Sequence, residues 1–424
     1  FIDIPAHFRT LVVPPWDHAF AHTAALYAFM YRGASVAAVQ AGKTANETLK
    51  NFSNNIQEVQ PHVLMSVPAL AKNFKKNIEK GVQTKGKVAW LLFRLAMAHA
   101  YWYNGTGNNK GRGLRRLTQP LGRLFDKILF SNVRLKLGGN LQFFIGGGAL
   151  LDIELQKFFY ALGIPMYQGY GLSEAAPIIS ANTPDYHKMG SSGKVVQQLD
   201  IRICDENGRD LPQGQSGEIV VKGENVMLGY WKNEKATAET IKDGWLFTGD
   251  LGYLDAENYL YVLGRFKSLL ISHDGEKYSP EGIEEALTDH CSLIDQVVLY
   301  NNQSPYTVGI AVPSADAIKK ILEKHPVSNP EEKSEIVLRE LQKELAQFKK
   351  GGHLQDLFPQ RWLPTTVVVA SEPFTEANHM VNSTMKIVRR KVEEVYAKEL
   401  EQLFTPSGKD LQNPVNRTNI QNYF

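Results

Sequence analysis

Residues 141–177, LQFFIGGGALLDIELQKFFYALGIPMYQGYGLSEAAP, contain the pattern that is most informative about the fold. It contains two short apolar runs, 141–145 and 164–170, which flank a segment with helical periodicity. Apolar runs that alternate with helices predict parallel strands joined by crossover helices. Each run ends in glycines, at 146–148 and 169–171. Because ligands bind beyond the carboxyl ends of parallel strands, these turns are candidates for a binding site.

The same alternation extends over the first 180 residues, and the pattern then changes twice. After 181, short apolar runs and the turn pair Asn207-Gly208 predict antiparallel strands forming a small barrel. After Arg265, a mixture of helices and strands predicts a smaller α+β domain, with Ser279 capping its first helix. The predicted organisation is an α/β part at 1–180, a β-barrel at 181–264, a hinge at 265–267, an α+β domain at 268–403 and a polar, loop-like tail at 404–424.

Composition indicates an ordinary soluble protein, with 43% hydrophobic and 21% charged residues. The formal net charge of +3 implies no bulk attraction to nucleic acid. Two cysteines, Cys204 and Cys291, cannot build a disulfide framework, and we expect buried free thiols. The sequence shows no apolar stretch of membrane-spanning length and no secretion signal at its start, so a cytoplasmic location is the expectation.

Residues 85–136 carry eleven Lys and Arg but one acidic residue, Asp126. Their apolar run VAWLLFRLAMAHAYW, beginning at Val88, is followed by several arginines. Such a segment either lies on an anionic membrane surface or forms a core helix with a solvated basic loop. We therefore expect either peripheral membrane contact through 85–136 or a purely structural role.

The second glycine turn, GYGLSE, offers an aromatic face at Tyr170, a hydroxyl at Ser173 and a carboxylate at Glu174. These groups suit a purine, a phosphate oxygen and Mg²⁺, which usually takes one or two carboxylates at a phosphate site. Asp250, in an apolar run after a glycine, either forms a turn or binds paired hydroxyls such as a ribose diol. Arg265 lies either at a domain interface or simply on the surface.

The order of these motifs, with GRFK at 264–267, DGEKYSPEG at 274–282 and STMKIVRRK at 383–391, resembles the adenylate-forming (AMP-binding) superfamily. The sequence is most similar to long-chain fatty acyl-CoA synthetases, over about residues 10–395. The resemblance implies that Gly146, Gly147 and Gly148 line the adenine site and that Tyr170 stacks on the purine. Asp250 would hold the ribose hydroxyls.

The same resemblance assigns the groups around the phosphates. Gly171 belongs to the nucleotide-binding turn, Ser173 would contact the α-phosphate, and Glu174 would bind Mg²⁺. Arg265 would lie near the nucleotide. Lys386 matches the family's adenylation lysine, whose charge would stabilise the transition state of the first step.

Three further positions follow from the resemblance. Lys267 matches the hinge about which the small domain rotates, and Gly275 matches a segment that lines the pantetheine tunnel. His18, in PPWDHAF, would lie near the carboxylate of the acyl substrate. The sequence departs from the family pattern at Met385, where a glycine is common, and lacks the serine that usually precedes the histidine.

The stretch AAVQAGKT, residues 37–44, is one glycine short of a phosphate-binding loop. In the family this segment is ordinary strand and helix, so we expect Lys43 to be a solvated helix-start lysine. The family's own Ser/Thr/Gly phosphate loop precedes the segment that PPWDHAF resembles. We find no such loop here and expect the family's N-terminal part to be missing.

The expected function is ATP-dependent activation of a fatty acid, through acyl-AMP, to acyl-CoA, AMP and pyrophosphate. The reactants would be the small molecules fatty acid, ATP and coenzyme A, with Mg²⁺. A fatty acyl-AMP ligase, another acid–thiol ligase of the superfamily and a catalytically impaired fragment are the alternatives. A triphosphatase acting through Lys43 is a more distant alternative.

Overall fold

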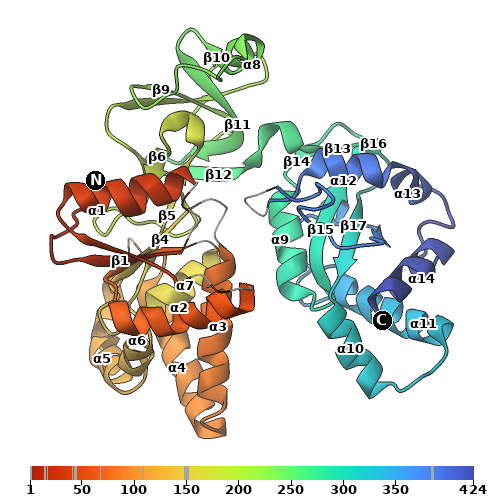
Figure 1. Ribbon diagram of the computed structural model, residues 1–424, viewed down its shortest axis with the longest axis horizontal. Helices are drawn as coiled ribbons and strands as arrows, with labels where there is room; N and C mark the ends of the chain where they lie inside the picture. The colour runs from red at the N-terminus through yellow and green to blue at the C-terminus, as the bar shows by residue number, and fades with distance from the viewer. Residues whose placement is uncertain are drawn as a thin grey trace. The chain divides into compact units, whose positions relative to one another are not determined.

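The computed structural model describes residues 2–13, 16, 18–40, 42, 45–66, 68–107, 109–147, 152–382 and 386–424. The chain divides into two compact units, Phe1–Val262 and Leu263–Phe424 (Figure 1). Gly148, Lys43 and Met385, which the sequence analysis discussed, lie outside the described residues.

Unit 1 is built on a seven-stranded sheet in the order β2-β1-β3-β4-β5-β6-β7. The first five strands run parallel, and β6 and β7 are antiparallel additions. The predicted parallel α/β sheet is therefore confirmed. The strands are β1 (Arg9–Val12), β2 (Ser35–Ala38), β3 (Val63–Ser66), β4 (Phe143–Gly146), β5 (Met166–Gly171), β6 (Ile178–Ala181) and β7 (Lys194–Val195).

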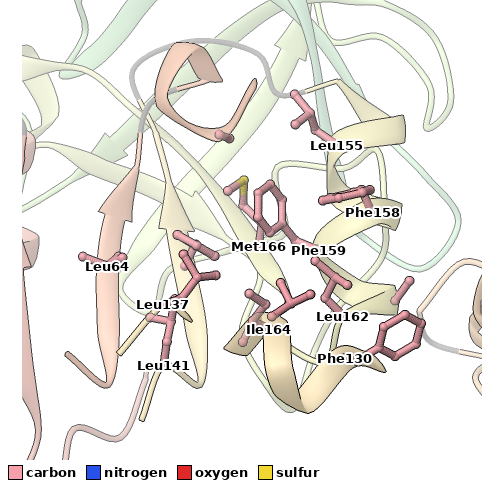
Figure 2. Close-up of a cluster of buried hydrophobic side chains, with 14 of the residues drawn as sticks. Leu64, Phe130, Leu137, Leu141, Leu155, Phe158, Phe159, Leu162, Ile164 and Met166 are labelled. Atoms are coloured by element: carbon pink, nitrogen blue, oxygen red, sulfur yellow. The ribbon is translucent and has the colours of Figure 1, made fainter. Parts of the chain in front are cut away.

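Helices cover both faces of this sheet, and alternate strand residues face each layer. Leu64 and Phe144 belong to the core beneath α2, α3, α4 and α7, whereas Val63 and Phe143 belong to the core beneath η1 and α1 (Figure 1). Figure 2 shows the first of these cores, in which Met166 of β5 lies among side chains from helix α7. The helices are η1 (a π-helix, Ala21–Tyr27), α1 (Ala28–Tyr31), α2 (Ala45–Val59), α3 (Pro68–Gln83), α4 (Lys87–Asn104), η2 (Gly113–Thr118), α5 (Gln119–Phe125), η3 (Asp126–Phe130), α6 (Ser131–Lys136), α7 (Ile153–Ala161) and η4 (Ser173–Ala175).

A second, antiparallel sheet completes unit 1, as predicted for residues after 181. Its order is β10-β11-β9-β8, with β12 also pairing with β11. Among the described residues these pairings form an open sheet rather than a closed barrel. The predicted turn holds, because Gly208 has φ +75° and Asp205 accepts hydrogen bonds from the backbone of residues 207 and 209. The elements are β8 (Leu199–Cys204), β9 (Gly217–Gly223), α8 (Glu234–Thr240), β10 (Ile241–Lys242), β11 (Trp245–Leu254) and β12 (Leu260–Arg265).

Unit 2 is the expected α+β unit. It contains a sheet in the order β14-β13-β16 and another in the order β15-β17-β18. Helix α11 buries Val337, Leu341 and Leu345 along one face, as its periodicity predicts. The elements are η5 (Phe266–Ser268), β13 (Leu270–Ser272), β14 (Lys277–Tyr278), α9 (Glu281–His290), β15 (Ile294–Tyr300), β16 (Asn302–Ser304), β17 (Val308–Pro313), α10 (Ala315–Lys324), α11 (Pro330–Ala346), η6 (Gln360–Trp362), β18 (Thr366–Val369), α12 (Arg389–Val395), α13 (Ala397–Gln402), α14 (Pro414–Ile420) and η7 (Gln421–Tyr423).

The prediction of a polar, loop-like tail at 404–424 was wrong. Helix α14 forms there, and Asn416 is completely buried against the edge strand β18. Its amide donates to the carbonyl oxygen of Val367 at 3.0 Å and accepts from the backbone N–H of Val369 at 2.7 Å. The side chain thus pairs with the strand edge as a neighbouring backbone would, which protects an otherwise open edge.

The predicted cap of α9 was also wrong. Pro280 has the helical φ of −73° expected at a helix start, but no side chain caps the helix. The hydroxyl of Ser279 is buried, and no hydrogen bond to it is recorded among the described residues. Both cysteines are buried free thiols, as predicted.

Candidate nucleotide site

The turn after β5 needs glycine at position 171. A Cβ atom there would lie 1.8 Å from the carbonyl oxygen of Pro177, whose carbonyl accepts from the backbone N–H of Leu172 at 2.8 Å. The chain then turns through η4 and passes Ala176, which has φ +53°, before returning as β6. The predicted GYGLSE turn is therefore a tight hairpin at the carboxyl end of a parallel strand.

A second segment, residues 225–230, holds this hairpin from outside. The Asn225 amide donates to the carbonyl oxygen of Ala175 at 2.9 Å. The backbone N–H of Met227 donates to the carbonyl oxygen of Glu174 at 2.8 Å. The Tyr230 hydroxyl donates to Oε1 of Glu174 at 2.9 Å. Both the backbone and the carboxylate of Glu174 are thus positioned. The sequence analysis missed Asn225 and Tyr230, which carry no diagnostic spacing.

Asp250 lies beside Tyr170, although the two residues are 80 positions apart. The Tyr170 hydroxyl donates to Oδ2 of Asp250 at 2.6 Å, and Asp250 is only 7% exposed. A hydroxyl bonded to a buried carboxylate is one of the stronger hydrogen bonds in proteins. The structure therefore brings together the predicted purine-stacking residue and the predicted ribose-binding residue.

An irregularity in β11 directs Asp250 toward this position. The pairing of β11 with β9 shifts register between Phe247 and Leu251, and Gly249 has φ +70°. The Thr248 hydroxyl accepts from the backbone N–H of Asp250 at 3.1 Å and donates to the carbonyl oxygen of residue 219 at 2.7 Å. Bulges of this kind redirect side chains near active sites. Thr248 was also missed, because a single hydroxyl residue in a strand gives no signal.

The first glycine turn follows β4, parallel to and paired with β5. Gly146 ends the strand, and the backbone N–H of Gly147 donates to the carbonyl oxygen of Ser66 at 3.3 Å. A Cβ atom on Gly147 would lie 3.3 Å from the Phe20 ring, so a larger residue would push that ring away. Gly147 thus makes room for the segment that contains His18.

His18 begins the helical segment after β1. Its Nδ1 accepts a hydrogen bond from the backbone N–H of Phe20 at 3.1 Å. Its carbonyl oxygen accepts one from the backbone N–H of Ala21 at 2.9 Å. Because β4 and β5 are parallel neighbours, Gly147 and Tyr170 lie at the same end of the sheet, and Phe20, two residues after His18, packs against Gly147.

Buried polar side chains form hydrogen bonds to Gln168 of β5 and to its neighbours. The Gln156 amide donates to Oε1 of Gln168 at 3.3 Å and accepts from the backbone N–H of Gly190 at 3.0 Å. The Asn182 amide donates to the carbonyl oxygen of Gln168 at 3.2 Å and to that of Ser191 at 2.7 Å. A buried polar network with satisfied partners favours one rigid arrangement.

The remaining candidate residues belong to unit 2. Arg265, at the end of β12, is exposed, and Lys267 follows in η5. Gly275 has φ +84° in the turn between β13 and β14, where its N–H donates to the carbonyl oxygen of Ser272 at 2.9 Å. This backbone conformation explains the glycine without any ligand.

Lys386 is exposed and precedes Ile387, which forms an isolated β-bridge with Val381. The Asn382 side chain accepts from the N–H of Lys386 at 2.8 Å, and the N–H of Asn382 donates to the carbonyl oxygen of Lys386 at 2.9 Å. Two hydrogen bonds with Asn382 therefore position the backbone of Lys386, which is exposed.

A buried ion pair anchors the helix that follows Lys386. Nη2 of Arg389 lies 2.7 Å from both carboxylate oxygens of Glu284, and Nη1 donates to the carbonyl oxygen of Leu299 at 2.7 Å. The two side chains are only 20% and 14% exposed. The sequence analysis missed this pair, whose members are 105 positions apart.

The fit to Mg²⁺ rests on Glu174. In the part of the chain that the structure describes, no three His, Cys, Asp or Glu side chains form a metal-binding group. A single half-exposed carboxylate fits a Mg²⁺ ion that takes its other ligands from phosphate oxygens and water. Nor does any described helix have the length and apolar character needed to span a bilayer.

Comparison with protein families gives a match over residues 2–231 to the family described as AMP-binding enzyme. The long-chain-fatty-acid–CoA ligase FadD15 of Mycobacterium bovis is 28% identical over 406 residues, covering 93% of this chain and 62% of the relative. Long chain acyl-CoA synthetase 8 of Arabidopsis thaliana is 29% identical, covering 85% of this chain and 51% of the relative. The chain thus spans about three fifths or less of these relatives' length.

A different acid appears among the other relatives. The 2-succinylbenzoate–CoA ligase of Bacillus cytotoxicus is 42% identical over 211 residues, covering 48% of this chain and 40% of the relative. Among solved structures, the adenylation domain of a carboxylate reductase from Mycobacterium chelonae matches with a TM-score of 0.65 and 19% identity, over 94% of this chain and 54% of that one. The Bacillus subtilis O-succinylbenzoate–CoA synthetase in complex with AMP matches with a TM-score of 0.58 and 22% identity, over 92% and 61%. These structures support the adenylate-forming fold.

Proposed function

The chain belongs to the family of AMP-binding enzymes, and from this premise we propose that it is the adenylating part of an acid–CoA ligase. The reaction would join a carboxylate to the α-phosphorus of ATP, release pyrophosphate, and pass the acyl group to the thiol of coenzyme A. The observation that carries the proposal is the contact between Tyr170 and the buried carboxylate of Asp250. This contact joins the glycine turn after β5 to strand β11 of the antiparallel sheet. One nucleoside bound at this point would touch both Tyr170 and Asp250.

In this proposal unit 1 binds the adenosine half of ATP. The Tyr170 ring stacks on adenine beside the Gly146–Gly148 turn, while Asp250 accepts hydrogen bonds from the ribose hydroxyls. A carboxylate has about four lone-pair sites, so Asp250 can accept from the ribose and keep its bond to Tyr170. The burial of Asp250 strengthens these hydrogen bonds, because the local dielectric is lower than that of water.

The phosphate groups would follow the hairpin after β5. Ser173 would donate to an α-phosphate oxygen, with Gly171 allowing the close approach of the backbone. Glu174, held by Tyr230, would bind Mg²⁺, which would supply positive charge to the phosphates. His18 would lie near the acyl carboxylate.

Lys386 would supply the remaining positive charge during the first step. An ammonium on a long stem acts as a point charge that can reach a phosphate. Arg265 and Lys267 would lie at the connection between the units, with Lys267 as the hinge, and Gly275 would border the pantetheine path in the second step.

We propose a long-chain fatty acid as the acyl substrate. The support is that relatives matching most of this chain are named long-chain fatty acid–CoA ligase and long-chain acyl-CoA synthetase. The alternatives are another acid, suggested by the 2-succinylbenzoate–CoA ligase match, an acyl-AMP ligase without a CoA step, and a chain that binds nucleotide without turnover.

The test is acid-dependent exchange of pyrophosphate into ATP by the full-length protein. The acids would be palmitate, octanoate, benzoate and 2-succinylbenzoate, followed by assay for the CoA thioester. Exchange with palmitate and formation of palmitoyl-CoA are expected. Exchange without thioester would favour the acyl-AMP ligase. Exchange only with an aromatic acid would refute the fatty-acid assignment while retaining the adenylation chemistry.

A further inference from the structure

The segment η2–α5–η3, residues 113–130, has an apolar stripe that faces solvent. Its apolar residues recur at intervals of three and four, the spacing of one helix face. In a soluble protein such a face normally packs on the core. Here these side chains are 44–79% exposed: Leu114, Leu117, Leu121, Leu124 and Ile128.

Helix α4 shows the same feature on the side that its core contacts do not use. One stripe is buried, including Phe93, Met97 and Ala100. A second stripe remains 43–73% exposed and consists of Val88, Leu91, Leu92, Leu95 and Trp102. The helix is therefore apolar on nearly all sides, although the core covers only one of them.

The two exposed stripes border one another. Helix α4 contacts both η2 and α5, and α4 and α5 lie on the face of the sheet opposite α1 (Figure 1). The His99 and Phe125 rings are 5.8 Å apart, and the Arg115 guanidinium lies 5.8 Å from the centre of the Trp102 ring. Together the exposed residues of 88–128 form one surface, here termed the apolar–basic face.

Positive charge surrounds these apolar side chains. Residues 85–136 contain eleven Lys and Arg against the single acid Asp126, for a local charge of +10, and Asp126 pairs with Arg134 at 2.7 Å. Within the part of the chain that the structure describes, no ion pair is recorded for Arg94, Arg112, Arg116, Arg123 or Lys127. The rest of the chain carries −7, so the positive charge is concentrated here (+3 minus +10).

We propose that the apolar–basic face docks on the surface of an anionic lipid bilayer. The leucines of η2 and α5 enter the boundary between headgroups and acyl chains, and the arginines bind lipid phosphates. An amphipathic basic helix lying in the membrane plane has this composition. An apolar partner surface would leave these arginines without anions, whereas lipid phosphates match their charge and accept bidentate hydrogen bonds.

The proposal does not depend on the reaction assigned to unit 1. It rests on exposure and charge at residues remote in sequence from Tyr170 and Asp250. A protein that proved inactive as a ligase would still bind vesicles if this inference is correct.

Vesicle co-sedimentation of the full-length protein provides the test. Vesicles of phosphatidylcholine alone would be compared with vesicles that also contain phosphatidylglycerol, at low and high salt. We expect binding only to the anionic vesicles and weakening by salt, because surface charges are screened. Absence of binding, or equal binding to both compositions, would overturn the proposal.

Matched variants separate the apolar and charged contributions. Replacing Arg112 and Arg116 by Gln should weaken binding roughly 25-fold, at about fivefold for each basic residue near an anionic surface. Replacing Lys320 and Lys324 of α10 by Gln removes the same charge elsewhere and should have a much smaller effect. An equal loss in both pairs would indicate attraction by net charge alone and would contradict the proposed face.

The apolar contribution is tested with Leu117→Ser and Leu121→Ser together. The control is Leu228→Ser, since Leu228 is fully exposed outside the face. The first pair should abolish sedimentation with vesicles while leaving the unfolding temperature near that of the control. If it instead converts a dimer to a monomer in a protein that does not bind vesicles, the face joins two copies of the chain and the proposal is wrong.

Fluorescence quenching by brominated lipid detects the membrane contact directly, without a variant that loses binding. Brominated phosphatidylglycerol should quench Trp102 fluorescence, and the quenching should fall in Trp102→Phe. Unchanged quenching in that variant would place the membrane contact elsewhere and overturn the assignment.

Discussion

The contact between Tyr170 and Asp250 allows a quantitative test of the candidate nucleotide site. Tyr170→Phe keeps the ring but removes the hydroxyl that donates to Asp250 at 2.6 Å. A hydrogen bond to a charged group contributes about 1.5–3 kcal/mol. We expect a loss of stability in unit 1 near the lower end of that range, because Tyr170 is half-buried and water can replace part of the bond.

A double-mutant cycle isolates this interaction. Asp250→Asn keeps an acceptor but removes the charge, so Tyr170→Phe should cost only about 0.5–1.5 kcal/mol in that background, as for a neutral hydrogen bond. The coupling free energy, which is the difference between the two losses, should be about 0.5 kcal/mol. Tyr186→Phe is the control, because Tyr186 is exposed.

Hydrogen exchange of β5 and β11 peptides in increasing urea is the suitable assay, since a chain with two units need not unfold in one transition. Calorimetric titration with AMP and 2′-deoxy-AMP then tests the binding role. Asp250→Asn should reduce discrimination between the two nucleotides, whereas Tyr170→Phe should retain it. Zero coupling would refute the energetic role of the contact, and unchanged discrimination in Asp250→Asn would place the diol contact elsewhere.

Three further predictions concern other residues. Lys386→Ala should abolish acyl-adenylate formation by the full-length enzyme but largely spare the transfer of the acyl group from supplied acyl-AMP to CoA. Lys398→Ala is the control, and equal loss of both steps in Lys386→Ala would contradict the assignment. Arg389→Lys should destabilise unit 2 by about 2–3 kcal/mol, which is less than the ~3–5 kcal/mol that breaking a fully buried ion pair costs. The same variant should slow adenylation more than thioester formation. An effect on stability alone would limit the Arg389–Glu284 pair to a structural role. Burial lowers the pKa of His187 to about 4, so the unfolded chain binds an extra proton as the pH falls below about 6.5. Hydrogen exchange of unit 1 peptides in increasing urea should therefore show about 2 kcal/mol of stability lost between pH 7 and pH 5. His187→Gln should remove this loss, and His325→Gln, at an exposed position, should not.

The parallel sheet could be predicted because its strands are apolar on both faces and separated by helical periodicity. The run at 141–145 and the one at 164–170 became β4 and β5 for this reason. The glycine turns were recognisable for a related reason, since Gly171 has no space for a Cβ atom. Local sterics and periodicity leave a visible pattern in the sequence.

Contacts between distant segments leave no such pattern. Asp250 was a candidate from its unusual position in an apolar run, but its pairing with Tyr170 depends on how the two sheets meet. Tyr230 and Thr248 were missed because one hydroxyl in a turn or strand resembles many others. The tail at 404–424 was misjudged from its polar composition, whereas the amide of Asn416 completes the edge of β18.

The contacts described here also suggest how a two-step reaction could use two units. Tyr170, Asp250 and Glu174 are held by bonds within unit 1, whereas Lys386 is held within unit 2 by Asn382 and by the anchor that follows it. Each of these bonds joins two residues of the same unit. In the proposed reaction the lysine charge is needed while pyrophosphate leaves and not while the thiol attacks. A lysine fixed within its own unit could serve the first step and be withdrawn for the second, with the nucleotide residues left in place.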